Sequence, residues 1–267
     1  MSSNGEFSDT DSLNRQAILA TLSELGATWS SVEIFESIDS TNAEVNRRLA
    51  QFALQDPLAI VAEEQTEGLG RLGRSWSTDY GTGIALSLGF NQELVRQVPS
   101  ALPLQIGSAV VAALAKFEVS ASLKWPNDIV FLNSDNSVRK CGGILVQQIS
   151  DTYIVGIGIN VLHTRDQLPT EIATSLLLEG FKVSPNELIA HIIFEVESAL
   201  QSSADWHAKY LGHCATIGNQ VAISQLTGPE IQGIAIGITE NGALIIQTDS
   251  AIEQVTIGDV QHAALQS

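Results

Sequence analysis

The chain has 267 residues, of which 44% are hydrophobic and 16% charged, which is typical of a folded globular protein and excludes an intrinsically disordered one. Thirteen Lys and Arg stand against 30 Asp and Glu, a formal net charge of −17, so general nucleic-acid binding is not expected. Two cysteines outside any C-x-x-C pattern argue against a disulfide framework or a zinc site and favour the cytoplasm. No apolar run is long enough to cross a membrane, and the polar, acidic N-terminus is unlike a signal peptide.

Helices are predicted where apolar residues recur at helical spacing. Residues 1–10 are expected to be disordered, and residues 11–25 form the first helix. The pattern Thr41-x-x-Glu44 is a capping box, which places the start of the second helix at Ser40 or Thr41.

The third helix opens near Ser100 and the fourth at Ser184-Pro185. Short apolar runs between the helices are typical of strands. The strands predicted in this part of the chain are 58–62, 83–90, 121–125, 128–132, 143–149 and 153–161. Because strands and helices do not alternate regularly, the pattern predicts an α+β fold with a mixed, mostly antiparallel sheet and helices on one side.

The sequence pattern changes near residue 214. Strands are predicted at 220–224, 231–239, 243–248 and 253–257, and Asn241-Gly242 is a strong hairpin signal. The chain is therefore divided into an N-terminal tail and single helix (1–30), a large domain (31–214) and a small β-barrel (215–267).

One segment is rich in both glycine and arginine: Gly68-Leu69-Gly70-Arg71-Leu72-Gly73-Arg74-Ser75. It fits G-x-G-x-x-G and nearly fits a P-loop, but the run that follows Trp76 predicts a strand where both motifs require a helix. The glycines let the backbone approach a ligand, and the arginines suit phosphate or carboxylate. The segment is interpreted as an anion clamp or, alternatively, as a surface loop whose arginines pair with Glu63, Glu64 and Glu67.

Four other segments are candidates for a site, and each also has an ordinary structural explanation. Lys124-Trp-Pro-Asn-Asp128 presents a carboxylate that could hold Mg²⁺, but Pro-Asn-Asp is also common in turns. Lys140, shortly before a glycine pair, points into a cleft or into solvent. Gly156-x-Gly158-x-Asn160 leaves one strand face bare, for a ligand or for tight packing. Ser40-Thr41-Asn42 could bind a small neutral ligand or cap a helix.

Cysteine and histidine provide no further candidates. Residues without a partner at catalytic spacing, which are interpreted as structural or surface residues, are Cys141, His163, His207 and His213.

Together and in this order, these motifs resemble those of the biotin protein ligases, over about residues 32–260. The resemblance implies a class II synthetase-like catalytic domain at 31–214 and an SH3-like barrel at 215–267. It also implies that biotin and ATP form biotinyl-5′-AMP with release of pyrophosphate, and that biotin then passes to a lysine of a biotin carboxyl carrier protein. Relatives often dimerise through the main sheet, so a homodimer is one expectation.

The resemblance assigns roles to individual residues. It implies catalytic roles for Lys140 and Arg71, which would neutralise the carboxylate of biotin and the α-phosphate of ATP. The biotin-binding residues that it implies are Ser40, Thr41, Asn42, Gln65, Gly68, Leu69, Gly70, Arg71, Lys140 and Gly143. The ATP-binding residues that it implies are Arg71, Arg74, Trp76, Lys124, Asn127, Asp128 and Asn160, with Asp128 also as a ligand of Mg²⁺.

Two departures from the family pattern bear on function. The family loop usually begins Gly-Arg-Gly-Arg, whereas Leu69 stands here, so the adenylate would be held less tightly if a guanidinium contributes at that position. Many bacterial relatives begin with a winged helix-turn-helix, whereas one helix is predicted before Ser40, which favours a short, monofunctional ligase that binds no DNA. The alternatives are a lipoate-type ligase, with an apolar slot for its substrate, and a non-catalytic nucleotide-binding module.

Overall fold

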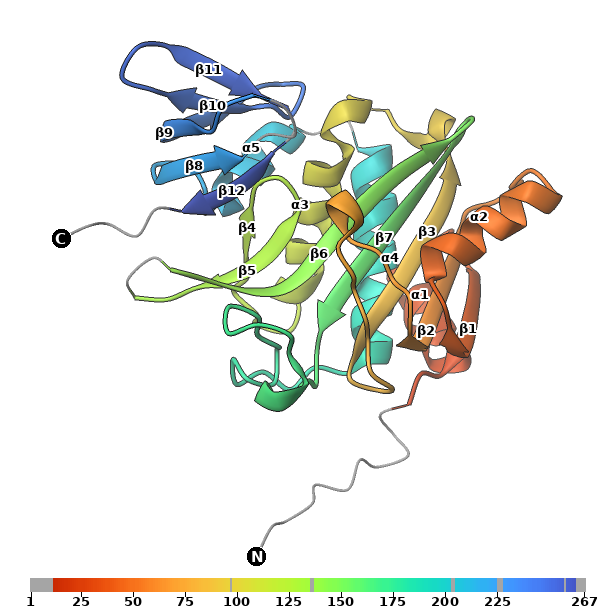
Figure 1. Ribbon diagram of the computed structural model, residues 1–267. Coiled ribbons are helices and arrows are strands. Elements are labelled where there is room, and N and C mark those ends of the chain that lie inside the picture. The colour runs from red at the N-terminus through yellow and green to blue at the C-terminus, as the bar shows by residue number, and fades with distance from the viewer. Residues whose placement is uncertain are drawn as a thin grey trace, which may run out of the picture.

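A seven-stranded mixed sheet forms the centre of the molecule (Figure 1). The computed structural model describes residues 12–96, 98–134, 137–202, 205–224, 228–256 and 258–262. The strand order is β1-β2-β3-β7-β6-β5-β4; β1 and β2 are parallel, and the other neighbouring pairs are antiparallel. The strands are β1 (Ser31–Ile38), β2 (Leu58–Gln65), β3 (Gly83–Asn91), β4 (Ser122–Lys124), β5 (Asp128–Leu132), β6 (Val138–Ile149) and β7 (Thr152–Asn160). The predicted mixed, mostly antiparallel sheet is confirmed.

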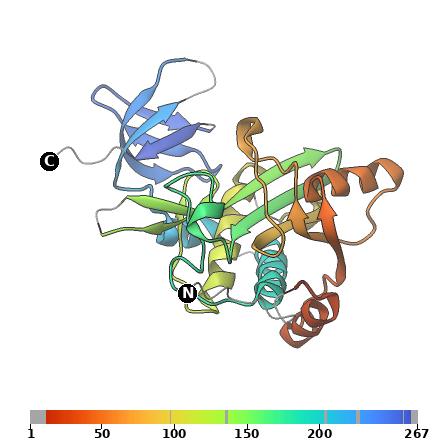
Figure 2. The same cartoon turned by 60° about the horizontal axis from the view of Figure 1, so that its bottom comes forward.

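Helices cover both faces of this sheet. The α-helices are α1 (Arg15–Leu25), α2 (Thr41–Gln51), α3 (Leu102–Ala115), α4 (Pro185–Gln201) and α5 (Trp206–His213). Figure 2 shows α1, α3 and α4 together on one face and α2 on the other. The prediction of helices on one side is thus wrong for α2, because Ile60 and Ile154 form an apolar patch on the second face and Val45 of α2 packs on it.

The two faces of β3 and β7 differ sharply in the size of their side chains. Toward α1, α3 and α4, β3 presents large apolar residues from Ile84 to Phe90 at alternate positions. On the other face most of the alternate residues at the centre of the sheet are small, including Ala85 and Ser87 in β3 and Gly156 and Gly158 in β7. This shallow face, partly covered by α2, leaves space above the centre of the sheet.

Several element boundaries differ from the prediction. Helix α1 starts at Arg15, because the Asn14 side chain accepts hydrogen bonds from Gln16 N and Ala17 N and caps it. Strand β6 begins at Val138 rather than at residue 143, and β1, α5 and β12 were not predicted. The expected disorder of residues 1–10, the first residue of the predicted helix and position 257 of the last predicted strand lie outside the described residues.

A separate five-stranded antiparallel sheet follows α5, in the order β11-β10-β9-β8-β12. Its strands are β8 (Gln220–Ser224), β9 (Ile231–Ile238), β10 (Leu244–Gln247), β11 (Ile252–Val255) and β12 (Asp259–His262). The predicted Asn241-Gly242 hairpin is confirmed, with Gly242 at φ +83°. Trp125 Nε1 donates to Gly242 O at 3.0 Å and so ties this hairpin to the β4–β5 turn of the main sheet.

Short 3₁₀ turns complete the chain: Arg71–Gly73, Gln92–Leu94, Pro99–Ala101 and Arg165–Gln167. Among the described helices, none combines the length and apolar character that a membrane span requires.

Candidate active site

A cavity of about 340 Å³ lies on the shallow face of the main sheet. Its walls are the start of α2, strands β6 and β7, the flap loop (residues 66–82, between β2 and β3) and the 161–174 loop after β7. Fourteen of the predicted site residues line it: Ser40, Thr41, Asn42, Gln65, Leu69, Gly70, Arg71, Arg74, Trp76, Asn127, Asp128, Lys140, Gly143 and Asn160. Gly68 and Lys124, which were also predicted, do not line it.

The end of the cavity next to α2 is uncharged and densely hydrogen-bonded. Ser40 is the N-cap of α2, its hydroxyl accepting from Ala43 N, so the predicted Thr41–Glu44 capping box is wrong. Thr41 instead donates its backbone N–H and its hydroxyl to Gln65 Oε1, at 2.9 and 3.0 Å. Both side chains are almost fully buried, so a helix start and a strand end are locked together by polar groups.

Ser87, which no sequence motif indicated, extends this network under the helix. Its fully buried hydroxyl lies 2.7 Å from Thr41 Oγ1 and 2.6 Å from Asn42 Oδ1. Asn42 Nδ2 in turn donates to Gln147 Oε1 of β6 at 2.9 Å. A Cβ at Gly156 would lie 2.5 Å from Asn42 Oδ1, so this glycine leaves the room that the Asn42 amide occupies.

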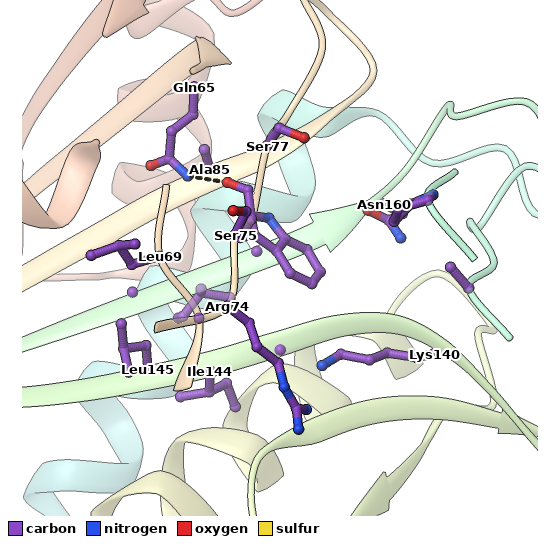
Figure 3. Close-up of a pocket in the computed structure, with 18 of the residues that line it drawn as sticks. Gln65, Leu69, Arg74, Ser75, Ser77, Ala85, Lys140, Ile144, Leu145 and Asn160 are labelled. Atoms are coloured by element: carbon purple, nitrogen blue, oxygen red, sulfur yellow. Dashed lines mark hydrogen bonds between the residues drawn. The ribbon is translucent and has the colours of Figure 1, made fainter. Parts of the chain in front are cut away.

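Gly68 holds the flap loop against this network. Gln65 Nε2 donates to Trp76 O at 3.2 Å (dashed in Figure 3), and Trp76 N donates to Gly68 O at 2.8 Å. A Cβ at position 68 would lie 1.9 Å from Gln65 Nε2 and 2.1 Å from Trp76 O. Gly68 therefore acts through close packing of the loop and lies behind the cavity wall rather than on it.

Trp76 roofs the middle of the cavity. Its indole lies directly over Gly158, where a Cβ would be 2.4 Å from the ring. Lys140 Nζ lies 5.6 Å from the ring centroid, within the range of a cation–π contact. The bare strand face that the glycine pattern predicted is thus occupied by Trp76 and Asn42.

The other end of the cavity is cationic. Lys140 Nζ pairs with Asp128 Oδ1 at 2.6 Å, and Arg71 Nη1 donates to Asn127 Oδ1 at 3.3 Å. In Figure 3 the side chains of Arg74 and Lys140 extend from the flap loop and β6 into the same part of the cavity. Arg71 therefore bonds across the cavity, and the alternative in which the arginines of the loop pair with its neighbouring glutamates does not hold for this residue.

Burial makes this charge costly without an anion. The pKa of Arg71 is lowered, mainly by burial, and the pKa of Lys124, the cross-strand neighbour of Asp128, is lowered for the same reason. Positive charges that repel one another here include Arg71, Arg74, Lys124 and Lys140, four of the 13 Lys and Arg in a chain of net charge −17. Such a concentration favours the binding of an anionic ligand.

The 161–174 loop fixes Lys140, a role that no sequence motif indicated. Lys140 lies in β6 rather than in the loop that was the alternative interpretation. Its N–H donates to Ile172 O at 2.7 Å, and its carbonyl accepts from Thr174 N at 2.8 Å. Asn160 Nδ2 donates to Thr174 O at 2.9 Å, so the same loop also orients Asn160. No apolar period marks the segment, and Leu168-Pro169 is its clearest local signal.

Comparisons with known proteins agree with this geometry. Sequence models of the Biotin/lipoate A/B protein ligase family and of the Biotin protein ligase C terminal domain match residues 34–163 and 216–263. The bifunctional ligase/repressor BirA of Escherichia coli is 30% identical over 242 residues, which span 86% of this chain and 73% of that protein. The chain belongs to the biotin protein ligase family.

Two further relatives match this ligase along nearly their whole length. The biotin–[acetyl-CoA-carboxylase] ligase of Mycobacterium tuberculosis is 29% identical over 264 residues, 94% of this chain and 96% of that one. The structure of the biotin protein ligase from Aquifex aeolicus in complex with biotin and ATP superimposes with a TM-score of 0.74 at 28% identity, covering 87% of this chain and 99% of that chain. The fold and the C-terminal sheet are thus those of this family.

Proposed function

We propose that this chain is an ATP-dependent biotin protein ligase, which forms biotinyl-5′-AMP and transfers biotin to a carrier protein. The observation that carries the proposal is a single cavity in which an uncharged, hydrogen-bonding end is continuous with a cationic end. The cyclic urea of biotin needs matched donors and acceptors once it is buried, and Ser40, Thr41 and Gln65 provide them. The carboxylate of biotin would then extend toward Lys140 and Arg71.

The cationic end fits the first chemical step. A carboxylate oxygen of biotin attacks the α-phosphorus of ATP, the bond to the bridging oxygen breaks, and pyrophosphate leaves. Two anions must meet, so Lys140 and Arg71 act by neutralising charge and by positioning, and no covalent enzyme intermediate is required. In the second step the ε-amine of the acceptor lysine attacks the carbonyl carbon of the mixed anhydride, and AMP leaves.

The nucleotide is assigned to the part of the cavity between Trp76 and Asn160. Trp76 offers an aromatic surface for the base, and Asn160 Oδ1 has no hydrogen bond among the described residues. Arg74 and Lys124 would contribute positive charge toward the phosphates, with Asn127 at the same end. The complex of the Aquifex relative with biotin and ATP supports ATP as the nucleotide.

Magnesium is proposed to enter with ATP. The described residues contain no group of three or more His, Cys, Asp or Glu that could hold a metal ion by themselves. Mg²⁺, however, commonly binds through one or two carboxylates plus substrate phosphates, and Asp128 lines the cavity beside the cations. Asp128 would therefore contribute one ligand, and the phosphates would contribute others.

The acceptor is proposed to be the biotin carboxyl carrier domain of acetyl-CoA carboxylase or of a related carboxylase. The name of the Mycobacterium tuberculosis relative supports this substrate class. The two free cysteines support a reducing cytoplasm as the setting. A homodimer and the absence of nucleic-acid binding stay predictions, as does the division at residues 30 and 214, with an SH3-like fold for the C-terminal sheet.

Incubation with biotin, MgATP and such a carrier domain, followed by intact-mass measurement, tests the function. We expect the carrier to gain one biotinyl group, and a carrier with its acceptor lysine changed to arginine to gain none. Lipoate replaces biotin in a parallel reaction, because the first family model also includes lipoate ligases. Modification by lipoate rather than biotin would establish the lipoate-type alternative, and ATP binding without any transfer would leave a nucleotide-binding module.

A further inference from the structure

His163 lies in the cavity wall, although its sequence context indicated only a structural or surface residue. It follows Asn160 by three residues and is 4% exposed. Gly83 pairs with Asn160 across β3 and β7, and a Cβ at Gly83 would lie 2.9 Å from His163 Cε1. The imidazole therefore occupies the space above this glycine, at the end of the cavity where Asn160 lies.

The hydrogen bonds around the ring fix its tautomer. Thr82 Oγ1 donates its single proton to Asp79 O at 2.7 Å, and it lies 3.0 Å from His163 Nε2. Since the hydroxyl has no second proton, Nε2 must be the donor in that contact. Burial lowers the pKa of His163, which favours the neutral ring. Nδ1 is then a lone-pair acceptor.

This acceptor has no partner among the described residues, and it is buried. An unsatisfied buried acceptor is uncommon in folded proteins and points to a missing water or ligand. Asn160, which also lines the cavity, presents a second acceptor, because its Nδ2 is already bonded to Thr174 O and leaves Oδ1 available. This end of the cavity therefore presents hydrogen-bond acceptors, which a ligand with a hydrogen-bond donor would satisfy.

We propose that His163 determines base specificity, its Nδ1 accepting a hydrogen bond from the 6-amino group of adenine. This inference rests on the proposed function and deepens it. Adenine presents an amino donor at this position, whereas guanine and hypoxanthine present a carbonyl acceptor. The carbonyl of such a base would face the lone pair of His163, so the site favours 6-aminopurines through attraction and excludes 6-oxopurines through repulsion.

Biotin-dependent pyrophosphate exchange with nucleotide analogues tests the role. The measured quantity is the ratio of kcat/KM for ATP to that for purine riboside triphosphate, in which hydrogen replaces the 6-amino group. We expect the wild-type ratio to be about 10 or more, as for a lost hydrogen bond to a buried group. In His163→Leu the ratio should fall at least about fivefold through a higher KM for ATP, with little change for the analogue.

Two amide variants provide a matched pair. The Asn side chain places Oδ1 where His has Nδ1, whereas the Gln side chain places its polar atom near Nε2. His163→Asn should therefore keep most of the discrimination between the two nucleotides, and His163→Gln should lose it. A purely structural role for His163 would change stability or kcat in these variants and leave the nucleotide ratio unchanged, which would overturn the proposal.

Nitrogen chemical shifts of the wild-type ring provide a test that needs no variant. We expect a neutral Nε2–H tautomer, with the Nδ1 resonance moving when a non-hydrolysable ATP analogue binds and not when the 6-unsubstituted analogue binds. An Nδ1–H tautomer, or equal shifts with both, would overturn the proposal. If the wild-type chain catalyses no exchange with ATP and biotin, the proposed function itself fails; exchange with an unchanged ratio in His163→Leu rejects only the inference.

Discussion

The two ends of the cavity reach specificity in different ways. At the uncharged end, Thr41, Gln65 and Ser87 are buried and bonded to one another, so the geometry is set before any ligand arrives. At the cationic end, Arg74 and Lys140 reach into the cavity on long side chains that are exposed or partly exposed. We infer that shape and hydrogen bonding select biotin, while positive charge promotes the reaction of its carboxylate.

Replacing the central cation should have the largest effect. Lys140→Ala removes the positive charge beside the reacting anions and leaves Asp128 without its partner. We expect biotin-dependent pyrophosphate exchange to fall about 100-fold or more, on the order of 3 kcal/mol in barrier. Lys116→Ala, which removes an exposed lysine paired with Glu195, is the matched control. A Lys140→Ala enzyme that kept more than roughly a tenth of the wild-type rate would exclude Lys140 from this role.

Displacing the flap loop at Gly68 should have the next largest effect on activity. Gly68→Ala places a Cβ against Gln65 and the backbone of Trp76, so the flap loop must move away. We expect a loss of about tenfold or more in kcat/KM, with weaker binding of both substrates.

Gly212→Ala, in α5 and outside the cavity, is the control for this change, because its Cβ would meet nothing within 4 Å. Its kcat/KM should stay within about threefold of wild type. Equal losses in the two variants would mean that close packing at residue 68 is not what holds the flap loop.

Changing the uncharged end should separate the binding of biotin from that of ATP. Thr41→Val keeps the shape but removes the hydroxyl that bonds Gln65 and Ser87, leaving buried polar groups unpaired at a cost of about 1–3 kcal/mol. Calorimetry should show biotin affinity reduced about tenfold, with the KM for ATP nearly unchanged. Thr21→Val on the exposed face of α1 is the control. A change in ATP affinity as large as that for biotin would contradict the division between the ends.

A change of ionic strength should have the smallest effect, and it should act differently on ligand binding at the two ends of the cavity. Raising ionic strength shortens the screening length from about 10 Å at 0.1 M to about 3 Å at 1 M. The KM for ATP should rise severalfold over this range, because its site is built from charges. The Kd of biotinamide, which has the ureido ring but no carboxylate, should hardly change. A similar salt dependence for both ligands would show that the uncharged end does not act independently.

Much of the fold was predictable because its signals are local. The apolar period of α4 and the Asn241-Gly242 turn act within a few residues, and both are as expected. The side of the sheet on which α2 packs could not be predicted, since it depends on Ile60 and Ile154, which lie 94 residues apart.

The same distinction holds within the candidate site. The glycine, arginine and lysine motifs could be recognised from their composition, and the structure brings most of their residues to one cavity. No local sequence pattern marked Ser87 or His163, because their roles depend on contacts with residues far away in the chain. Ser87 contacts Thr41, 46 residues away, and His163 contacts Thr82, 81 residues away. Gly68 and Lys124 belong to the predicted motifs but do not line the cavity.

A crystal structure with biotin and a non-hydrolysable ATP analogue would test the central claim most directly. We expect the ureido ring to bond Thr41 and Gln65, and the carboxylate to lie between Arg71 and Lys140, facing the α-phosphate. A biotin bound in the opposite direction, with its ring among the cations and its acid group beside α2, would contradict the account.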